Sequence, residues 1–208
     1  MSANTNTTAV HTDKKTRVMV EEAVLIAIIL MMAFTPIGYI KVGALSISLI
    51  TIPVAIGAIA ISPAAGALLG CVFGITSFAQ CFTGDAFGAA LISISPFYAF
   101  LVCIPTRILA GWLCGLVFKA LHRPAKLRKI SYYIGGFSMG FFNTVFFMSV
   151  LVICYWNAEV VQAWSQSLGA LNPITFIVLS ISLNAIVEWV SCTVVGGVVG
   201  LALSKANH

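Results

Sequence analysis

Long apolar stretches follow one another along this chain and are separated by short polar or basic linkers. A helix of about 20 apolar residues crosses the hydrocarbon core of a bilayer. Continuous apolar runs without strict alternation favour helices over a transmembrane barrel. The pattern therefore predicts an all-α membrane protein, a six-transmembrane-helix bundle. The segments are predicted at about residues 17–40, 49–61, 64–80, 96–121, 130–155 and 173–203.

The basic residues fall almost entirely on one side of this predicted topology. Cytoplasmic loops carry an excess of Lys and Arg, which predicts a bundle with both ends inside the cell, N-in and C-in. Omitting the short segment 49–61 would put the basic linker at 122–129 on the wrong side, so this segment is predicted to cross. Residues 1–17 lack the apolar core of a signal peptide and are expected to be a flexible cytoplasmic tail. Residues 18–205 then form a single membrane domain in the plasma membrane.

Composition excludes a water-soluble fold. The chain is 60% hydrophobic and only 8% charged, whereas a soluble domain carries about 25% charged residues. The net charge of +5 lies beside predicted helix ends rather than in a separate patch, so no nucleic-acid partner is expected. The six cysteines are scattered and are interpreted as small apolar packing residues. Neither a metal site nor a cofactor is predicted.

Four strongly polar residues lie inside the predicted spans. At about 1.5 Å per residue, Arg107, Asn143 and Asn184 reach similar depths near the bilayer centre, and Glu188 follows Asn184 by one turn. A charge at that depth costs a few kcal/mol and needs a partner. One interpretation is a structural Arg107–Glu188 ion pair with the asparagines bridging helices. The other is a polar cavity for a ligand, which the number of such groups favours.

Further candidates lie near the predicted external ends. Tyr98 and Trp156 fit either an interfacial aromatic belt or a lid over a ligand. Gln80 and Ser95 offer additional polar contacts. The residues predicted to bind substrate are Arg107, Asn143, Asn184, Glu188, Tyr98, Ser95, Gln80 and Trp156.

Several motifs together resemble a known family. Ala23 and Ala27 form a small-residue strip on the first predicted helix, where another helix can approach closely. The runs at 47–74, 103–121 and 182–190 add to the pattern. Over nearly its whole length the chain resembles the substrate-binding S component of energy-coupling factor (ECF) vitamin transporters, in the general vitamin branch.

This resemblance implies a function. An S component captures a vitamin from outside and delivers it through a transmembrane coupling subunit that is driven by two ATPase subunits. Ala23 and Ala27 match the strip that meets the coupling subunit. Pantothenate is the favoured vitamin, because Arg107 suits its carboxylate, while riboflavin, hydroxymethylpyrimidine and cobalamin remain open. The matching gating loop comprises Lys41, Val42, Gly43, Ala44, Leu45 and Ser46.

Two other classes compete with this interpretation. An intramembrane enzyme would need paired carboxylates or a His-based set at membrane depth, but His11, His122 and His208 lie in tails or a linker. A self-sufficient channel or a proton-coupled transporter would use Arg107 and Glu188 as a relay. The chain contains no Gly-x-x-x-x-Gly-Lys-Ser/Thr motif, so ATP hydrolysis is expected in partner subunits and not here.

Overall fold

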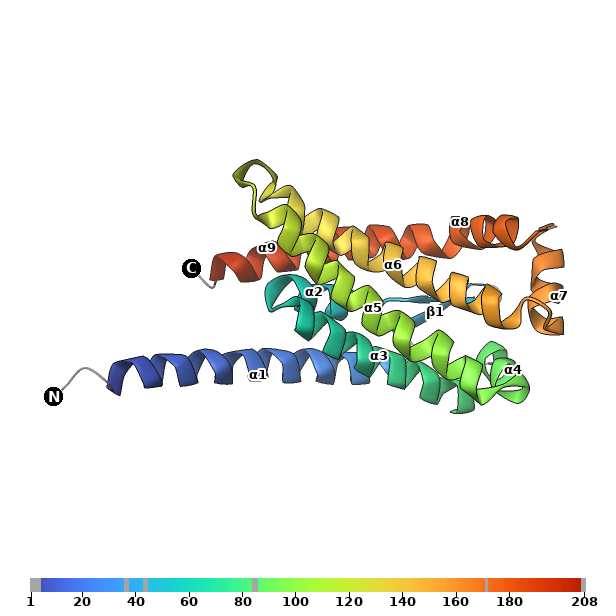
Figure 1. Ribbon diagram of the computed structural model, residues 1–208, viewed down its shortest axis with the longest axis horizontal. Helices are drawn as coiled ribbons and strands as arrows, with labels where there is room; N and C mark the ends of the chain where they lie inside the picture. Colours follow the sequence, from blue (N-terminus) through green and yellow to red (C-terminus); the bar gives the residue numbers. More distant parts are fainter. Residues whose placement is uncertain (1–4, 36–37, 43–44, 84–85, 171, 207–208) are drawn as a thin grey trace.

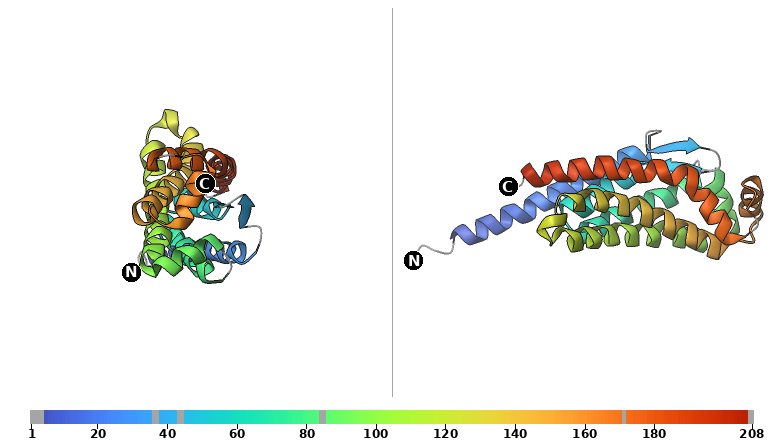
Figure 2. Two further views of the ribbon diagram at one scale, coloured as in Figure 1. Left: turned by 90° about the vertical axis from the view of Figure 1, so that its right-hand side faces the viewer. Right: turned by 90° about the horizontal axis from the view of Figure 1, so that it is seen from above.

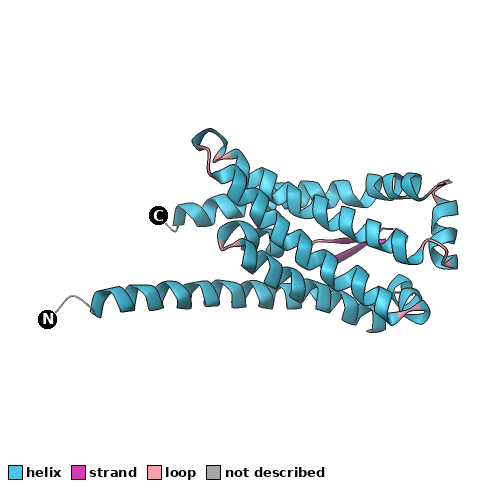
Figure 3. Ribbon diagram, viewed as in Figure 1, coloured by secondary structure: helices cyan, strands magenta, loops and turns pink. Residues whose placement is uncertain are grey.

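The described chain is almost entirely helical and forms one elongated bundle (Figures 1 and 3). The computed structural model describes the backbone of residues 5–35, 38–42, 45–83, 86–170 and 172–206. Side chains are described for all of these except residues 5–14, 39–42, 45–47, 181–184 and 204–206. The elements are α1 (Thr5–Ala33), β1 (Tyr39–Val42), β2 (Leu45–Ser48), α2 (Thr51–Ala60), α3 (Pro63–Thr83), α4 (Ala86–Ile94), α5 (Pro96–His122), the 3₁₀ turn η1 (Ala125–Leu127), α6 (Ile130–Tyr155), α7 (Glu159–Ser167), α8 (Pro173–Ser191), the π-helical turn η2 (Cys192–Gly196) and α9 (Gly197–Ala206).

Four helices in the described chain are long and apolar enough to cross a membrane. They span Pro63–Thr83, Pro96–His122, Ile130–Tyr155 and Ala185–Leu203. The segment predicted at 49–61 is instead the ten-residue helix α2, which is about 15 Å long. It is shorter than a hydrocarbon core of about 30 Å, because strand β2 ends just before it and the Ser62–Pro63 turn follows it. Most of its residues are buried among the longer helices.

The two ends of the bundle differ in character. Both termini, the α2–α3 turn and the basic α5–α6 linker lie at one end (Figure 1). The short helices α4 and α7 lie at the other, and α7 packs across the axis of the bundle (Figures 1 and 2). The basic groups that the sequence analysis assigned to one side of the membrane therefore gather at one end of the molecule.

Four segments that lie in the predicted tail or between the predicted spans have regular structure. The predicted tail at 1–17 is helical from Thr5, because no Gly or Pro interrupts residues 5–17 and extending an existing helix costs little. The linker at 41–48 belongs to an antiparallel hairpin in which Tyr39 pairs with Ser48 and Val42 with Leu45. Apolar and polar residues alternate through Leu45–Ser48, which is typical of a strand.

The stretches at 81–95 and 156–171, which lie between the predicted spans, also contain helices, α4 and α7. The residues of α4 are small or apolar with no proline until Pro96, which begins the next helix. In α7, Val161 and Ser165 are buried one turn apart, so the helix presents one face to the bundle.

Two apolar clusters form the core. One gathers Ile29, Ile50, Leu69, Phe73, Ala110 and Met139 with their neighbours toward the end that carries the termini. The other gathers Leu91, Val102, Met148, Tyr155 and Phe176 toward the end that carries α4 and α7. Along α6, Asn143 lies between Met139 of the first cluster and Met148 of the second. Along α5, Arg107 lies between Ala110 and Val102 in the same way, so a polar layer separates the two clusters.

Glycines bring α3 and α5 into backbone contact. A Cβ atom on Gly70 would overlap the carbonyl of Arg107, and one on Gly74 would meet the backbone of Cys103 and Ile104. Gly66 and Gly111 face each other in the same interface. Small residues at helix interfaces allow this close approach in membrane proteins. The contact fixes the height and rotation of α5, and with them the position of Arg107.

We expect Gly70→Ala to lower the free energy of unfolding by about 1–3 kcal/mol, because the added methyl group overpacks a backbone contact. Thermal unfolding of the detergent-solubilised protein measures the change. Ala79→Val on an exposed position of the same helix is the matched control and should leave the melting temperature nearly unchanged. Equal melting temperatures for all three proteins would contradict the proposed role of this contact.

Candidate ligand-binding site

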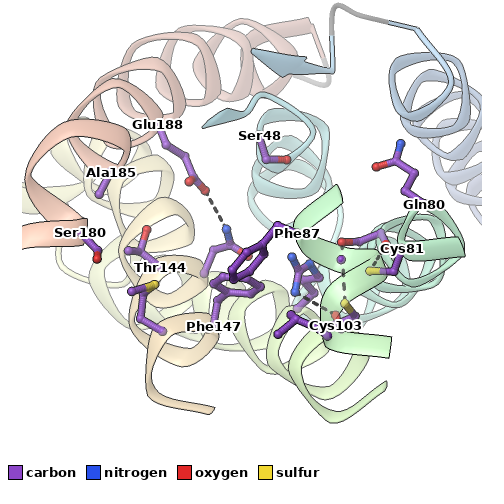
Figure 4. Close-up of a pocket in the computed structure, with 16 residues that line it drawn as sticks. Ser48, Gln80, Cys81, Phe87, Cys103, Thr144, Phe147, Ser180, Ala185 and Glu188 are labelled. Atoms are coloured by element: carbon purple, nitrogen blue, oxygen red, sulfur yellow. Dashed lines mark hydrogen bonds between the residues drawn. The ribbon is translucent and has the colours of Figure 1, made fainter. Parts of the chain in front are cut away.

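A cavity of about 120 Å³ lies in the polar layer between the two apolar clusters (Figure 4). Helices α3, α4, α5, α6 and α8 line it, together with the end of strand β2. Its walls combine apolar surface with charged, amide and hydroxyl groups. The lining residues are Ser48, Ser77, Gln80, Cys81, Phe87, Gly88, Leu91, Cys103, Arg107, Asn143, Thr144, Phe147, Met148, Ser180, Ala185 and Glu188.

Arg107 is held by its own helix. Its Nη1 atom donates to the carbonyl of Val102 at 2.9 Å and to that of Cys103 at 3.1 Å. Pro105 lies within this turn, and a proline inside a helix removes a backbone hydrogen bond and bends the helix. The proline leaves the carbonyl of Leu101 without its usual donor, whereas the carbonyls of Val102 and Cys103 accept from Arg107 in addition to their place in the helix.

Two aromatic rings complete the support of the guanidinium. Its Cζ atom lies 4.9 Å from the ring centroid of Phe73 and 5.0 Å from that of Phe147. A cation over an aromatic face is stabilised by about 0.5–2 kcal/mol, with the larger values in desolvated sites. The guanidinium is thus oriented by contacts that leave its Nε atom without a hydrogen-bond partner.

Asn143 on α6 and Glu188 on α8 form a second wall of the cavity. Asn143 Nδ2 donates to Glu188 Oε1 at 2.9 Å (Figure 4), and both side chains are buried. Because a carboxylate accepts and does not donate, this bond fixes which way round the Asn143 amide lies. Its Oδ1 atom is then an acceptor, and it has no partner.

Unsatisfied polar atoms concentrate in this cavity. Among the described residues, four buried side-chain nitrogen or oxygen atoms lack a hydrogen-bond partner: Ser48 Oγ, Arg107 Nε, Asn143 Oδ1 and Ser180 Oγ. All four residues line the cavity. Leaving a buried polar atom unpaired costs about 1–3 kcal/mol. The cavity therefore has an unused donor on Arg107 and an unused acceptor on Asn143.

Arg107 and Glu188 do not form an ion pair. Within the described part of the chain, the one ion pair joins the exposed side chains of Arg17 and Glu21. Among the described residues, no carboxylate therefore lies within salt-bridge distance of Arg107. This arrangement favours the cavity interpretation over that of a structural ion pair.

The structure brings four of the eight predicted substrate-binding residues to the cavity, namely Arg107, Asn143, Glu188 and Gln80. The amide of Gln80 also donates to the carbonyl of Ala33, which ties α3 to α1. The side chain of Asn184 lies outside the described residues.

The other three predicted residues lie away from the cavity lining. The Ser95 hydroxyl accepts from the Tyr98 N–H at 3.4 Å and so caps the start of α5. The Tyr98 ring meets Tyr155 edge-on at 5.9 Å. The Trp156 ring meets Phe176, also at 5.9 Å. These residues contribute to the packing and capping of the end that carries α4 and α7.

Sequence reasoning missed several lining residues. Ser180 precedes Glu188 by eight residues on α8, so helical spacing places both on one face, and this signal was available. Phe147 follows Asn143 by one turn on α6 in the same way. Ser48 had no comparable signal, because it reaches the cavity from the end of a strand that the sequence analysis treated as a loop.

The predicted docking and gating residues have distinct positions. Ala23 and Ala27 are exposed on α1. Of the gating loop, Gly43 and Ala44 lie outside the described residues. The backbones of Lys41, Val42, Leu45 and Ser46 belong to the hairpin, and their side chains are not described.

A family model described as the substrate-specific component of ECF transporters matches residues 17–199. The chain belongs to this family. No curated protein matches the sequence significantly. Members of the family are substrate-binding subunits of membrane transporters rather than enzymes.

We expect Ser180→Ala to raise the melting temperature of the ligand-free protein, because it removes a buried hydroxyl that has no partner. The matched control is Ser165→Ala. The Ser165 hydroxyl is also buried, but it donates to the carbonyl of Ala170 at 2.9 Å, so its loss should cost about 1 kcal/mol. Equal destabilisation by the two substitutions would contradict the assignment of Ser180 to an unsatisfied site.

Proposed function

We propose that this chain is an S component that captures a small vitamin bearing a carboxylate, with pantothenate as the favoured ligand, from outside the cell. A transmembrane coupling subunit and two ATPase subunits then complete an importer in the plasma membrane. The observation that carries the proposal is the unneutralised guanidinium of Arg107 facing a cavity across from the Asn143 amide.

The chemistry of the two walls supports this ligand class. Arg107 offers a planar, permanently charged donor that suits a carboxylate. Asn143 Oδ1 and the hydroxyls of Ser48 and Ser180 are matched by hydroxyl and amide groups on the ligand. Pantothenate combines one carboxylate with several hydroxyl and amide groups, so its two ends suit the two walls.

The size of the cavity supports a gated site. Its volume of about 120 Å³ is below the range of about 300–1,000 Å³ that is usual for small-molecule pockets. Ser48 both ends strand β2 and lines the cavity. Movement of the β1–β2 hairpin would therefore enlarge the cavity and open it to the ligand, which is the role expected of the gating loop.

We also propose the N-in, C-in orientation with six segments in the membrane. Both termini lie at the same end of the bundle as the basic α5–α6 linker (Figure 1), as the positive-inside rule requires. In this arrangement α1 and α2 accompany the four long apolar helices. In this proposal the hairpin and α2 together span the hydrocarbon core, which α2 alone is too short to cross.

We expect gently purified protein to release a small carboxylate that mass spectrometry identifies, and Arg107→Ala to purify without it. Calorimetric titration should show binding weakened by about 2–5 kcal/mol, because the substitution removes a desolvated charge partner. The affinity of Arg107→Lys should lie between those of the unaltered protein and Arg107→Ala, since lysine keeps the charge but lacks the planar guanidinium.

Lys126→Ala removes a cation that does not line the cavity. This variant is the control, and its affinity for the ligand should be unchanged. A folded Arg107→Ala protein with unchanged affinity would exclude the proposed role of Arg107. A copurified ligand without an anionic group would exclude the proposed ligand class.

We expect Ala23→Trp and Ala27→Trp to preserve ligand binding by the isolated chain but to abolish uptake by the complete importer. Both alanines are exposed on α1, and an indole at either position blocks the close approach of a partner helix. Ala79→Trp on an exposed position of α3 is the control and should support normal uptake. Uptake at the normal rate by both docking variants would exclude this surface as the contact.

A further inference from the structure

A second hollow, of about 390 Å³, lies at the end of the bundle that carries the termini. It is formed by the α2–α3 turn and the last turns of α5. We call it the basic-end pocket, and it is separate from the ligand cavity in the polar layer. Its lining residues are Ala58, Ile59, Ile61, Ser62, Pro63, Gly115, Phe118, Lys119, His122 and Arg123.

The lining of the basic-end pocket has two chemical halves. Ile59, Ile61 and Phe118 supply an apolar surface. Lys119 and Arg123 supply exposed positive charges, and His122 is half-buried beside them. A pocket with one apolar side and one cationic side matches an amphiphile with a negatively charged head.

A closed hydrogen-bond network orients a third cation next to this pocket. Arg128 Nε donates to His122 Nε2 at 3.1 Å, so the proton of a neutral His122 ring lies on Nδ1 and points to Ser131 Oγ at 2.9 Å. Ser131 Oγ in turn donates to the carbonyl of Arg128 at 2.8 Å. The network holds the Arg128 guanidinium beside His122.

The cations of this pocket have no acidic residue near them along the chain. The sequence contains no Asp or Glu from residue 86 to residue 158, a stretch that includes the whole of α5, η1 and α6. The positive-inside rule explains why cations gather at this end. It does not explain why two of them border a hollow with an apolar wall.

An exposed stripe on α5 leads into the basic-end pocket. Leu109, Trp112 and Leu116 are exposed apolar residues. They follow one another at intervals of three or four residues, and Lys119 and Arg123 continue this spacing. Arg123 keeps α-helical backbone angles, so all five residues lie along one face. The rise from Leu109 to Lys119 is about 15 Å, which is half of a hydrocarbon core of about 30 Å. The apolar part therefore matches the length of one lipid chain.

We propose that the basic-end pocket binds one anionic phospholipid. Its phosphate lies between Lys119 and Arg123, and one acyl chain follows Leu116, Trp112 and Leu109 along α5. Basic pockets between membrane helices on the cytoplasmic side bind anionic headgroups in this manner. The apolar wall and the stripe favour a lipid over free inorganic phosphate, which would gain nothing from either.

The test is native mass spectrometry of the detergent-solubilised protein with dioleoyl phosphatidylglycerol or dioleoyl phosphatidylcholine. We expect one phosphatidylglycerol molecule to be retained in preference to phosphatidylcholine. The double variant Lys119→Gln/Arg123→Gln should weaken this retention about 25-fold, at about fivefold for each cation removed. The matched control Lys126→Gln/Lys129→Gln removes the same charge from residues outside the pocket lining. It should change retention by no more than about twofold at an ionic strength that screens distant charges.

Each further outcome decides between the lipid and its alternatives. Equal losses for the two double variants would show diffuse surface charge and overturn the proposal. Displacement of the lipid by an equal concentration of inorganic phosphate would show a simple anion site and also overturn it. Leu116→Asn should weaken retention of both lipids, because it interrupts the acyl-chain stripe, and no change would overturn the proposed chain path. If the Lys119/Arg123 double variant does not fold, Lys119→Gln alone carries the test, with an expected loss of about fivefold.

Discussion

The burial of the Arg107 guanidinium is the constraint on which the rest of the site depends. A cation at mid-depth in a membrane bundle costs several kcal/mol unless its environment compensates. Here two carbonyls of its own helix and two aromatic rings compensate in part, and no carboxylate within the described chain completes the pairing. An anionic ligand therefore meets a charge that is desolvated, oriented and not already neutralised. An internal salt bridge would have to be broken before such a ligand could bind.

The packing of α3 against α5 determines where this charge lies. Gly70 contacts the backbone of Arg107 directly. Phe73, less than one turn further along α3, stacks on the guanidinium, and Ser77 reaches the cavity wall one turn beyond that. One face of α3 therefore serves first as a packing surface and then as part of the site. Residues that fix the fold and residues that shape the cavity are neighbours on the same helix.

The sequence predicted how far along its helix each polar residue lies. It predicted only in part which face of the helix the residue occupies. Arg107, Asn143 and Glu188 were found because polar groups in apolar spans are rare and their depths agree. Tyr98 was selected for its position near a helix end, yet it precedes Arg107 by nine residues. At about 100° per residue, this spacing places it on the opposite face of α5.

Other features depended on tertiary structure that no local pattern specifies. The hydroxyls of Ser48 and Ser180 resemble many other hydroxyls in apolar segments until the bundle leaves them without partners. The short helix α2 was predicted to span because of the charge pattern. Its length instead follows from the hairpin that ends before it at Ser48 and the Ser62–Pro63 turn after it.

The supports of the two cavity walls differ, and this difference bears on how a bound ligand is released. Arg107 is held by carbonyls four and five residues earlier on α5 and by aromatic rings on α3 and α6. Its support therefore does not involve α8 or the hairpin. Asn143 depends on a bond from α6 to Glu188 on α8, and Ser48 arrives on strand β2. A ligand held between the two walls would bridge α5 to α8 and to strand β2. Displacement of the hairpin or of α8 relative to α5 would therefore break the bridge without disturbing the support of Arg107. The charge that attracts the ligand would remain in place for the next one.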